Sequence, residues 1–104
     1  MTRPANRLRG EASLEIDGTA HVLRPSFENL VAAEEEIGSL FALVERASEG
    51  ALTAREIAAL LWHCLADENR PPRDKVGEAV LAMGLVAATG PVRTILAQVL
   101  QGRG

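Results

Sequence analysis

Aromatic residues and cysteines are scarce in this chain of 104 residues. Aromatic side chains make up 3% of it, as Phe27, Phe41 and Trp62, and there is no tyrosine. A base-stacking surface needs several aromatic rings, so a platform for single-stranded nucleic acid is excluded. The one cysteine, Cys64, excludes a disulfide framework within the chain and a zinc site built from several cysteines. The core must therefore be built from aliphatic side chains.

The chain also lacks long apolar runs and a strong net charge. No stretch of about 18 apolar residues is present, so no transmembrane helix and no membrane partner are predicted. The arginines near the N-terminus have no apolar segment behind them, so no secretory signal is predicted and a cytoplasmic location is expected. The net charge of −3 argues against nucleic acid as the main partner.

Length and composition indicate a single folded domain over residues 1–104. The apolar fraction is 47% and the charged fraction 24%, as in ordinary globular proteins. A chain of this length buries enough surface to fold without a disulfide or a metal. We predict an α+β fold with an N-terminal arm (1–11), an N-terminal β-hairpin (12–24) and a compact bundle of four to five α-helices (26–101).

The hairpin is predicted from alternation and from its turn. Leu14 and Ile16 alternate with polar residues, which places both on one face of a strand. Asp17-Gly18 suits a two-residue hairpin turn, because both central residues need a positive φ. A two-stranded hairpin is marginal alone, so we expect it to dock on the helices or to extend the sheet of a neighbour.

Helical segments are predicted to begin near residues 26, 39, 53, 73 and 91. Thr53 and Glu56 have the spacing of a capping box, and the polar linker 67–72 contains two prolines. Gly90-Pro91 is interpreted as a break followed by a new helix. Helical spacing predicts the following inward side chains: Phe27, Leu30 and Val31; Leu40, Leu43, Val44 and Ala47; Ile57, Leu60, Leu61, Cys64 and Leu65; Val76, Ala79, Val80 and Met83; Val92, Ile95, Leu96, Val99 and Leu100.

Two side chains leave alternatives open. Glu34 falls on the same predicted stripe as Phe27. It is either a boundary residue that is solvated or paired with an arginine near the hairpin, or a buried charge that fixes the hairpin against the helix through a specific ion pair. Trp62 lies roughly 130° from the centre of its helix's apolar stripe. Its helix is therefore either packed on several sides or presents Trp62 to a partner.

No catalytic, cofactor or metal motif is found. The P-loop, GxGxxG, HExxH and CxxC patterns are all absent. His21, His63 and Cys64 are interpreted as structural, because the adjacent His63 and Cys64 point about 100° apart on a helix. We therefore predict no catalytic residue, no cofactor and no metal, and we expect a protein that is not an enzyme.

Charged groups suggest where a partner binds. Glu34, Glu35 and Glu36 form an acidic run, which is typical of a solvated face or of a surface for a basic partner. The basic arm, with Arg3, Arg7 and Arg9, lacks the density of a nucleic-acid tail. The predicted partner-binding residues are Trp62 and Ala58 on the outer side of the third helix, followed by Glu35 and Glu36.

The order of several short motifs resembles a known family. The motifs are Asn6–Glu11, Asp17-Gly18, Leu23–Glu28, Leu52-Thr53, Glu56–Ala58, Leu61-Trp62, Val76–Glu78 and Gly84-Leu85. In this order the chain resembles the small phage-tail proteins of gene transfer agents of α-proteobacteria, which are encoded between the major tail protein and the tape measure. The resemblance extends from about Asn6 to Leu100.

The resemblance implies a tail assembly chaperone. Such a helper would bind the tape measure protein, and also the major tail protein, and keep the long tape measure helices soluble during assembly. Family members are also labelled tail-tube-like, so a structural subunit of the tail is the alternative, and a homo-oligomer is left open. A mainly β tube subunit needs long strands, whereas this sequence predicts one hairpin. A small DNA-associated packaging factor is a third class, which the acidic charge disfavours.

Overall fold

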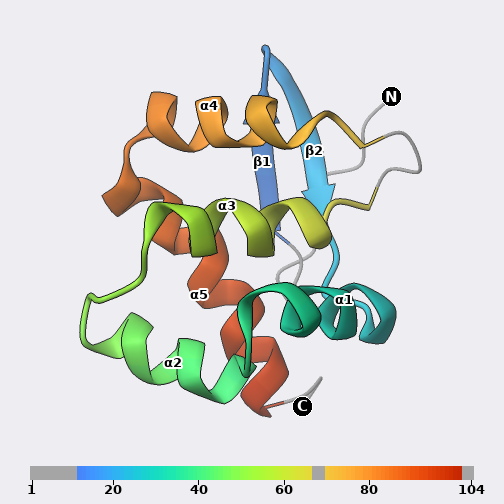
Figure 1. The fold of residues 1–104 in the computed structure, drawn as a ribbon. Coiled ribbons are helices and arrows are strands. Elements are labelled where there is room, and N and C mark those ends of the chain that lie inside the picture. Colours follow the sequence, from blue (N-terminus) through green and yellow to red (C-terminus); the bar gives the residue numbers. More distant parts are fainter. Residues whose placement is uncertain (1–11, 67–69, 102–104) are drawn as a thin grey trace.

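A computed structural model describes residues 12–66 and 70–101, which form a β-hairpin followed by five helices (Figure 1). The predicted α+β fold is confirmed; the predicted arm (1–11) lies outside the described residues. The elements are β1 (Ala12–Ile16), β2 (Thr19–Leu23), α1 (Phe27–Ile37), α2 (Leu40–Ser48), α3 (Ala54–His63), α4 (Arg73–Met83) and α5 (Leu85–Gln101).

The hairpin has the tight turn that its sequence predicts. Asp17 and Gly18 adopt φ values of 51° and 81°, and Ile16 pairs with Thr19 beside them. Both central residues are left-handed, as a two-residue hairpin turn requires. Leu14 and Ile16 are buried, and β1 packs against α4 and α5. The hairpin therefore docks on the helices through its apolar face.

The hairpin is extended by the segment that follows α3. The Arg24 amide donates to the Cys64 carbonyl at 2.6 Å, and the Ala66 amide donates to the Val22 carbonyl at 3.0 Å. Leu23 thereby forms an antiparallel bridge with Leu65. This pairing satisfies backbone groups at one end of β2 and fixes the hairpin to the end of α3.

Local signals set the helix boundaries. Ser26, Ser39 and Thr53 each accept a hydrogen bond from the backbone of the following helix, and Thr53 and Glu56 form a full capping box. The chain leaves α1 and α4 through Gly38 and Gly84, which have φ values of 91° and 92°. Glycine tolerates these positive values without the Cβ penalty of other residues.

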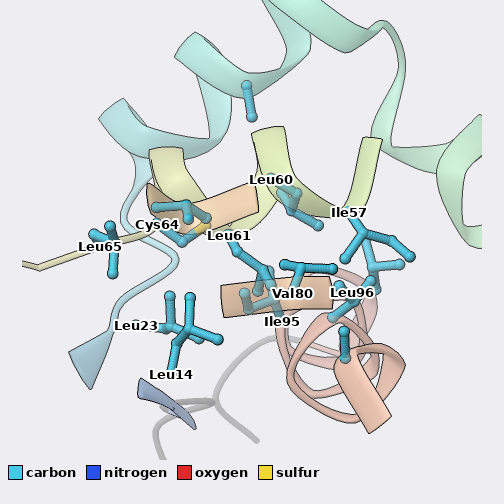
Figure 2. Close-up of a cluster of buried hydrophobic side chains, with 14 of the residues drawn as sticks. Leu14, Leu23, Ile57, Leu60, Leu61, Cys64, Leu65, Val80, Ile95 and Leu96 are labelled. Atoms are coloured by element: carbon cyan, nitrogen blue, oxygen red, sulfur yellow. The ribbon is translucent and has the colours of Figure 1, made fainter. Parts of the chain in front are cut away.

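The core surrounds α3, which packs against α1, α4 and α5 (Figure 1). The five apolar residues predicted to face inward from this helix are all buried: Ile57, Leu60, Leu61, Cys64 and Leu65. Figure 2 shows their side chains gathered with Leu14 and Leu23 of the hairpin, Val80 of α4, and Ile95 and Leu96 of α5. Two strands and several helices thus share one aliphatic core.

The predicted break at Gly90-Pro91 is wrong, because α5 continues through Pro91. Proline at a helix interior removes a backbone donor and clashes with the preceding turn. The buried stripe on both sides of Pro91, with Ala88 before it and Val92 and Ile95 after it, holds the helix against the core. The Thr94 hydroxyl donates to the Gly90 carbonyl at 3.2 Å within the same region. Tertiary packing overrides the local helix-breaking signal here.

Several predicted inward residues face solvent instead. Phe27 is 83% exposed and Val31 is 37% exposed, because α1 packs through Leu30, Ala33 and Ile37. The spacing of Phe27, Leu30 and Val31 defines a stripe, but the buried stripe is rotated away from Phe27. The predictions for Met83 and Leu100 are also wrong, since both lie at helix ends and are 39% and 49% exposed.

Among the described residues, no single helix is long and apolar enough to cross a membrane. Helices α4 and α5 reach that length and composition only when taken together, and they are bent by 115° at Gly84.

Candidate functional site

Trp62 lies at the centre of the predicted partner-binding region, on the side of α3 that faces the start of α4. Its Nε1 donates to the Pro71 carbonyl at 2.9 Å, which satisfies the indole N–H. The Cζ atoms of Arg70 and Arg73 lie 4.9 Å and 4.4 Å from the ring centroid. Cation–π contacts of this kind fix the arginines over the ring. Trp62 is therefore half-buried and partly covered by its own chain.

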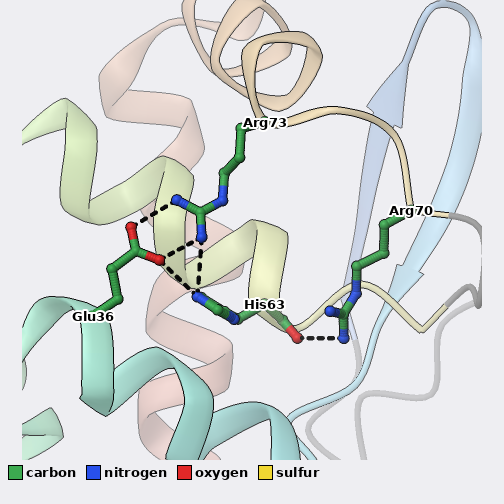
Figure 3. Close-up of polar contacts among 4 residues, drawn as sticks. All are labelled: Glu36, His63, Arg70 and Arg73. Carbon is green, nitrogen blue, oxygen red and sulfur yellow. Dashed lines mark hydrogen bonds and ion pairs between the residues drawn. The ribbon is translucent and has the colours of Figure 1, made fainter.

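A polar triad beside Trp62 joins three helices: Glu36 at the end of α1, His63 at the end of α3 and Arg73 at the start of α4 (Figure 3). Arg73 donates to both carboxylate oxygens of Glu36, one at 2.6 Å through Nη1. His63 Nε2 lies 2.8 Å from Glu36 Oε1 and 3.2 Å from Arg73 Nη2. The triad thus crosslinks α1, α3 and α4.

The triad changes the acidity of its carboxylate. Hydrogen bonds from Arg73, and then from His63, lower the pKa of Glu36 from 4.5 to about 2. The same carboxylate raises the pKa of Arg73. Glu36 therefore remains ionised at every pH at which proteins normally work, and its charge is already neutralised within the chain.

The adjacent cysteine is chemically inert. Cys64 is fully buried, and loss of solvation raises the pKa of its thiol to about 12. A thiol with this pKa holds almost no thiolate at neutral pH, so it is a poor nucleophile and a poor metal ligand. Residues 12–66 and 70–101 contain no group of three or more His, Cys, Asp and Glu side chains that could hold a metal.

The acidic run divides into three different roles. The Glu34 carboxylate accepts a hydrogen bond from the Leu40 backbone amide at 3.1 Å and so helps to cap α2. Glu34 is exposed, which makes the alternative of a buried ion pair with the hairpin wrong. Glu35 is exposed to solvent, whereas Glu36 points into the triad. Only Glu35 behaves as the fully solvated residue that a charge run predicts.

The structure brings Trp62 and Glu36 into contact with the same Arg73 guanidinium. Ala58 precedes Trp62 by one turn of α3 and is half-buried against the core. Glu35 lies on the outer face of α1. The partner-binding role of these four residues stays a prediction.

Sequence analysis missed Arg70, which lies in the linker between α3 and α4. Its guanidinium donates to the carbonyls of Leu65 and His63 at 3.3 Å and 3.1 Å, and to Asn29 Oδ1 at 3.0 Å. These bonds satisfy carbonyls at the end of α3. The adjacent prolines, Pro71 and Pro72, were the available signal, because they predict an ordered, extended linker.

A shallow apolar groove was also missed. It encloses about 320 Å³ between the end of α2, the start of α3 and the first turns of α5. Its lining includes Ala47, Leu52, Ile57, Leu85, Val86 and Arg93. Val86 is 88% exposed on its rim. The lining residues come from three segments far apart in sequence, so no single periodic pattern indicates the groove.

Comparison with known proteins gives one match. A family model described as "phage tail tube protein, GTA-gp10" matches residues 9–102. The chain belongs to this family. The matched range includes the hairpin and all five helices of the described residues, so the resemblance to gene transfer agent tail proteins is confirmed. No curated protein and no solved structure matches the chain.

Membership of this tail family sets the coarse function. The family description places the chain among phage tail proteins of gene transfer agents, and it names a tube component. Other tail proteins are therefore the class of partner. The description does not decide between a subunit of the tail and a helper that acts during tail assembly.

Proposed function

We propose that this chain is a tail assembly chaperone of a gene transfer agent, which binds the tape measure protein before the tail tube closes around it. The observation that carries the proposal is a helical fold with many large apolar side chains left on its surface. Within the described residues these are Phe27, Val31, Phe41, Leu81, Met83, Leu85, Val86 and Leu100. Exposed apolar groups of this kind suit transient binding to the apolar faces of partner helices.

The small amount of sheet favours a chaperone over a wall subunit. The described residues form one sheet of two strands, each five residues long. A closed β-structured ring needs strands that pair continuously around its circumference. The family description nevertheless fits the alternative, a structural subunit that stays in the tail.

The chaperone would act inside the host cell and contact more than one tail protein. The chaperone acts without catalysis, in the cytoplasm of an α-proteobacterial host, and contacts the major tail protein as well as the tape measure. The inert Cys64 thiol and the internal pairing of His63 with Glu36 support a role in binding rather than in chemistry.

Two experiments test the proposal. Co-expression with the tape measure protein of the same locus, followed by size-exclusion chromatography, is expected to give co-elution and a more soluble tape measure. Mass spectrometry of purified particles is expected to find none of this chain. Stoichiometric amounts in mature particles, with no effect on tape measure solubility, would favour the structural subunit.

A matched pair of variants tests the predicted partner-binding residues. Glu35→Lys reverses an exposed charge that has no partner among the described residues, and it is expected to weaken tape measure binding. Glu49→Lys makes the same change at an exposed position beyond α2 and serves as the control. Equal effects of the two variants would remove Glu35 from the binding surface.

A further inference from the structure

The groove beside α5 has an apolar floor and a basic rim. Ile57 and Val92 are buried and form the apolar floor, whereas Val86 and Arg93 are exposed at the edge. Val86 and Arg93 are seven residues apart on α5, so they share one side of that helix. In the described part of the chain, no carboxylate contacts Arg93, and no acidic residue lines the groove. A complementary ligand would present an apolar side chain beside a carboxylate.

The outer face of α1 presents that combination. Phe27 and Val31 lie one turn apart and are exposed, with Phe27 at 83%. Glu35 follows Val31 by one turn of α1, and Glu28 lies seven residues before Glu35, so both carboxylates flank the exposed side of the helix. Both carboxylates are exposed and have no partner among the residues that the structure describes. The α1 face is thus apolar and acidic where the groove is apolar and basic.

The two surfaces cannot meet within one chain. In Figure 1, α1 lies at the right of the molecule, whereas the turn between α4 and α5 and the end of α2 lie at the left. Contact between them requires two copies. Because the surfaces differ, the contact would be head-to-tail, and each copy would keep one free surface of each kind.

We propose that a second copy of this chain inserts Phe27 into the groove, with the carboxylates of its α1 face against Arg93. The groove, at about 320 Å³, is large enough for an aromatic side chain and is too small for a whole helix. The complementary charges orient the incoming helix. This inference rests on the two surfaces alone and not on the proposed chaperone function.

The proposed contact buries little surface, so a method that detects weak association is needed to measure it. One aromatic anchor and a charged rim bury less surface than a stable protein–protein interface needs. We therefore expect weak association that becomes visible as the chain concentration approaches about 1 mM, and that weakens as salt is added. Sedimentation velocity over a concentration series resolves this behaviour.

Two monomeric variants give a test that depends on the head-to-tail geometry. Phe27→Asp destroys the α1 face and leaves the groove intact, whereas Val86→Asp does the reverse. Both side chains are more than four-fifths exposed, so both variants are expected to fold. Each variant alone should remain a monomer, whereas the average mass of their equimolar mixture should rise with concentration toward that of a 1:1 dimer and never exceed it.

Phe41→Asp is the matched control, because Phe41 is an exposed aromatic residue that does not line the groove. This variant should associate like the unmodified chain. The proposal is overturned if the unmodified chain stays monomeric up to about 1 mM. It is also overturned if either single variant associates as strongly as the unmodified chain, or if their mixture contains monomers alone.

Discussion

Arg73 donates a hydrogen bond from Nη1 to Glu36 Oε2 across 2.6 Å and so joins the start of α4 to the end of α1. These residues are 37 positions apart in the sequence, and the buried His63 lies against both. Because one carboxylate holds two neighbouring helices against α3, its charge state affects the stability of the whole helical bundle.

Acid should weaken this link. The folded pKa of Glu36, about 2, lies below the unfolded value of 4.5, so the unfolded chain binds more protons at intermediate pH. The stabilisation is therefore complete above pH 4.5 and is lost as the pH falls toward 2. Because the pair is partly open to solvent, we expect a contribution of about 1 kcal/mol at neutral pH.

The check is a comparison of urea unfolding of the unmodified chain and Glu36→Gln between pH 7 and pH 2. The difference in unfolding free energy should shrink toward zero at the acidic end. Glu35→Gln is the control, since Glu35 is exposed and should show no such pH dependence. A constant difference for Glu36→Gln across this range would contradict the assigned cause.

Pro91→Ala should stabilise the chain. The alanine restores a backbone donor inside α5 and removes the ring from the preceding turn. Greater freedom of the unfolded chain offsets part of this gain, so we expect a net increase of about 1–2 kcal/mol in unfolding free energy. Thermal and urea unfolding both measure it.

Pro72→Ala provides the contrast, because Pro72 precedes α4 and is in extended conformation. There the substitution should give no gain in stability. Equal effects at the two positions would show that Pro91 does not destabilise α5.

Trp62 should stabilise the bundle in two separable ways. Trp62→Phe keeps a ring beneath Arg70 and Arg73 but loses the Nε1 hydrogen bond to Pro71, at a cost of about 1 kcal/mol. Trp62→Ala also loses the ring and its packing and should cost about 2–3 kcal/mol. Unfolding followed by circular dichroism compares the two. Equal losses would mean that the ring itself adds little.

The Cys64 thiol should react slowly in the folded protein. Burial raises its pKa to about 12, so both access and thiolate content are low at pH 8. We expect modification by an aromatic disulfide reagent to be at least about 100-fold slower in buffer than in denaturing urea. Similar rates in the two conditions would show that the end of α3 opens readily.

The elements with strong local signals were predictable from the sequence. The Asp17-Gly18 turn and the Thr53–Glu56 capping box each depend on residues close in sequence, and both form as expected. The inward stripe of α3 was also predictable, since that helix is surrounded by other elements and its apolar side is buried whatever its exact rotation.

The incorrect or missing predictions concern features that depend on contacts between residues far apart in the sequence. The exposure of Phe27 reflects how α1 is rotated against α3, and the continuity of α5 through Pro91 reflects packing on the core. The inward turn of Glu36, away from its neighbour Glu35, depends on Arg73 in another helix. A charge run indicates polarity alone, so it could not show which glutamate has a partner.

The pairing of Leu23 with Leu65 places a condition on the order of folding. The turn of the hairpin can close early, because it involves neighbouring residues, but the end of β2 finds its backbone partners only after residue 66 has been synthesised. Until then the hairpin lacks this pairing, and α4 and α5, the helices that cover its apolar face, are synthesised later still. On a translating ribosome, the hairpin would thus emerge before the elements that make it stable.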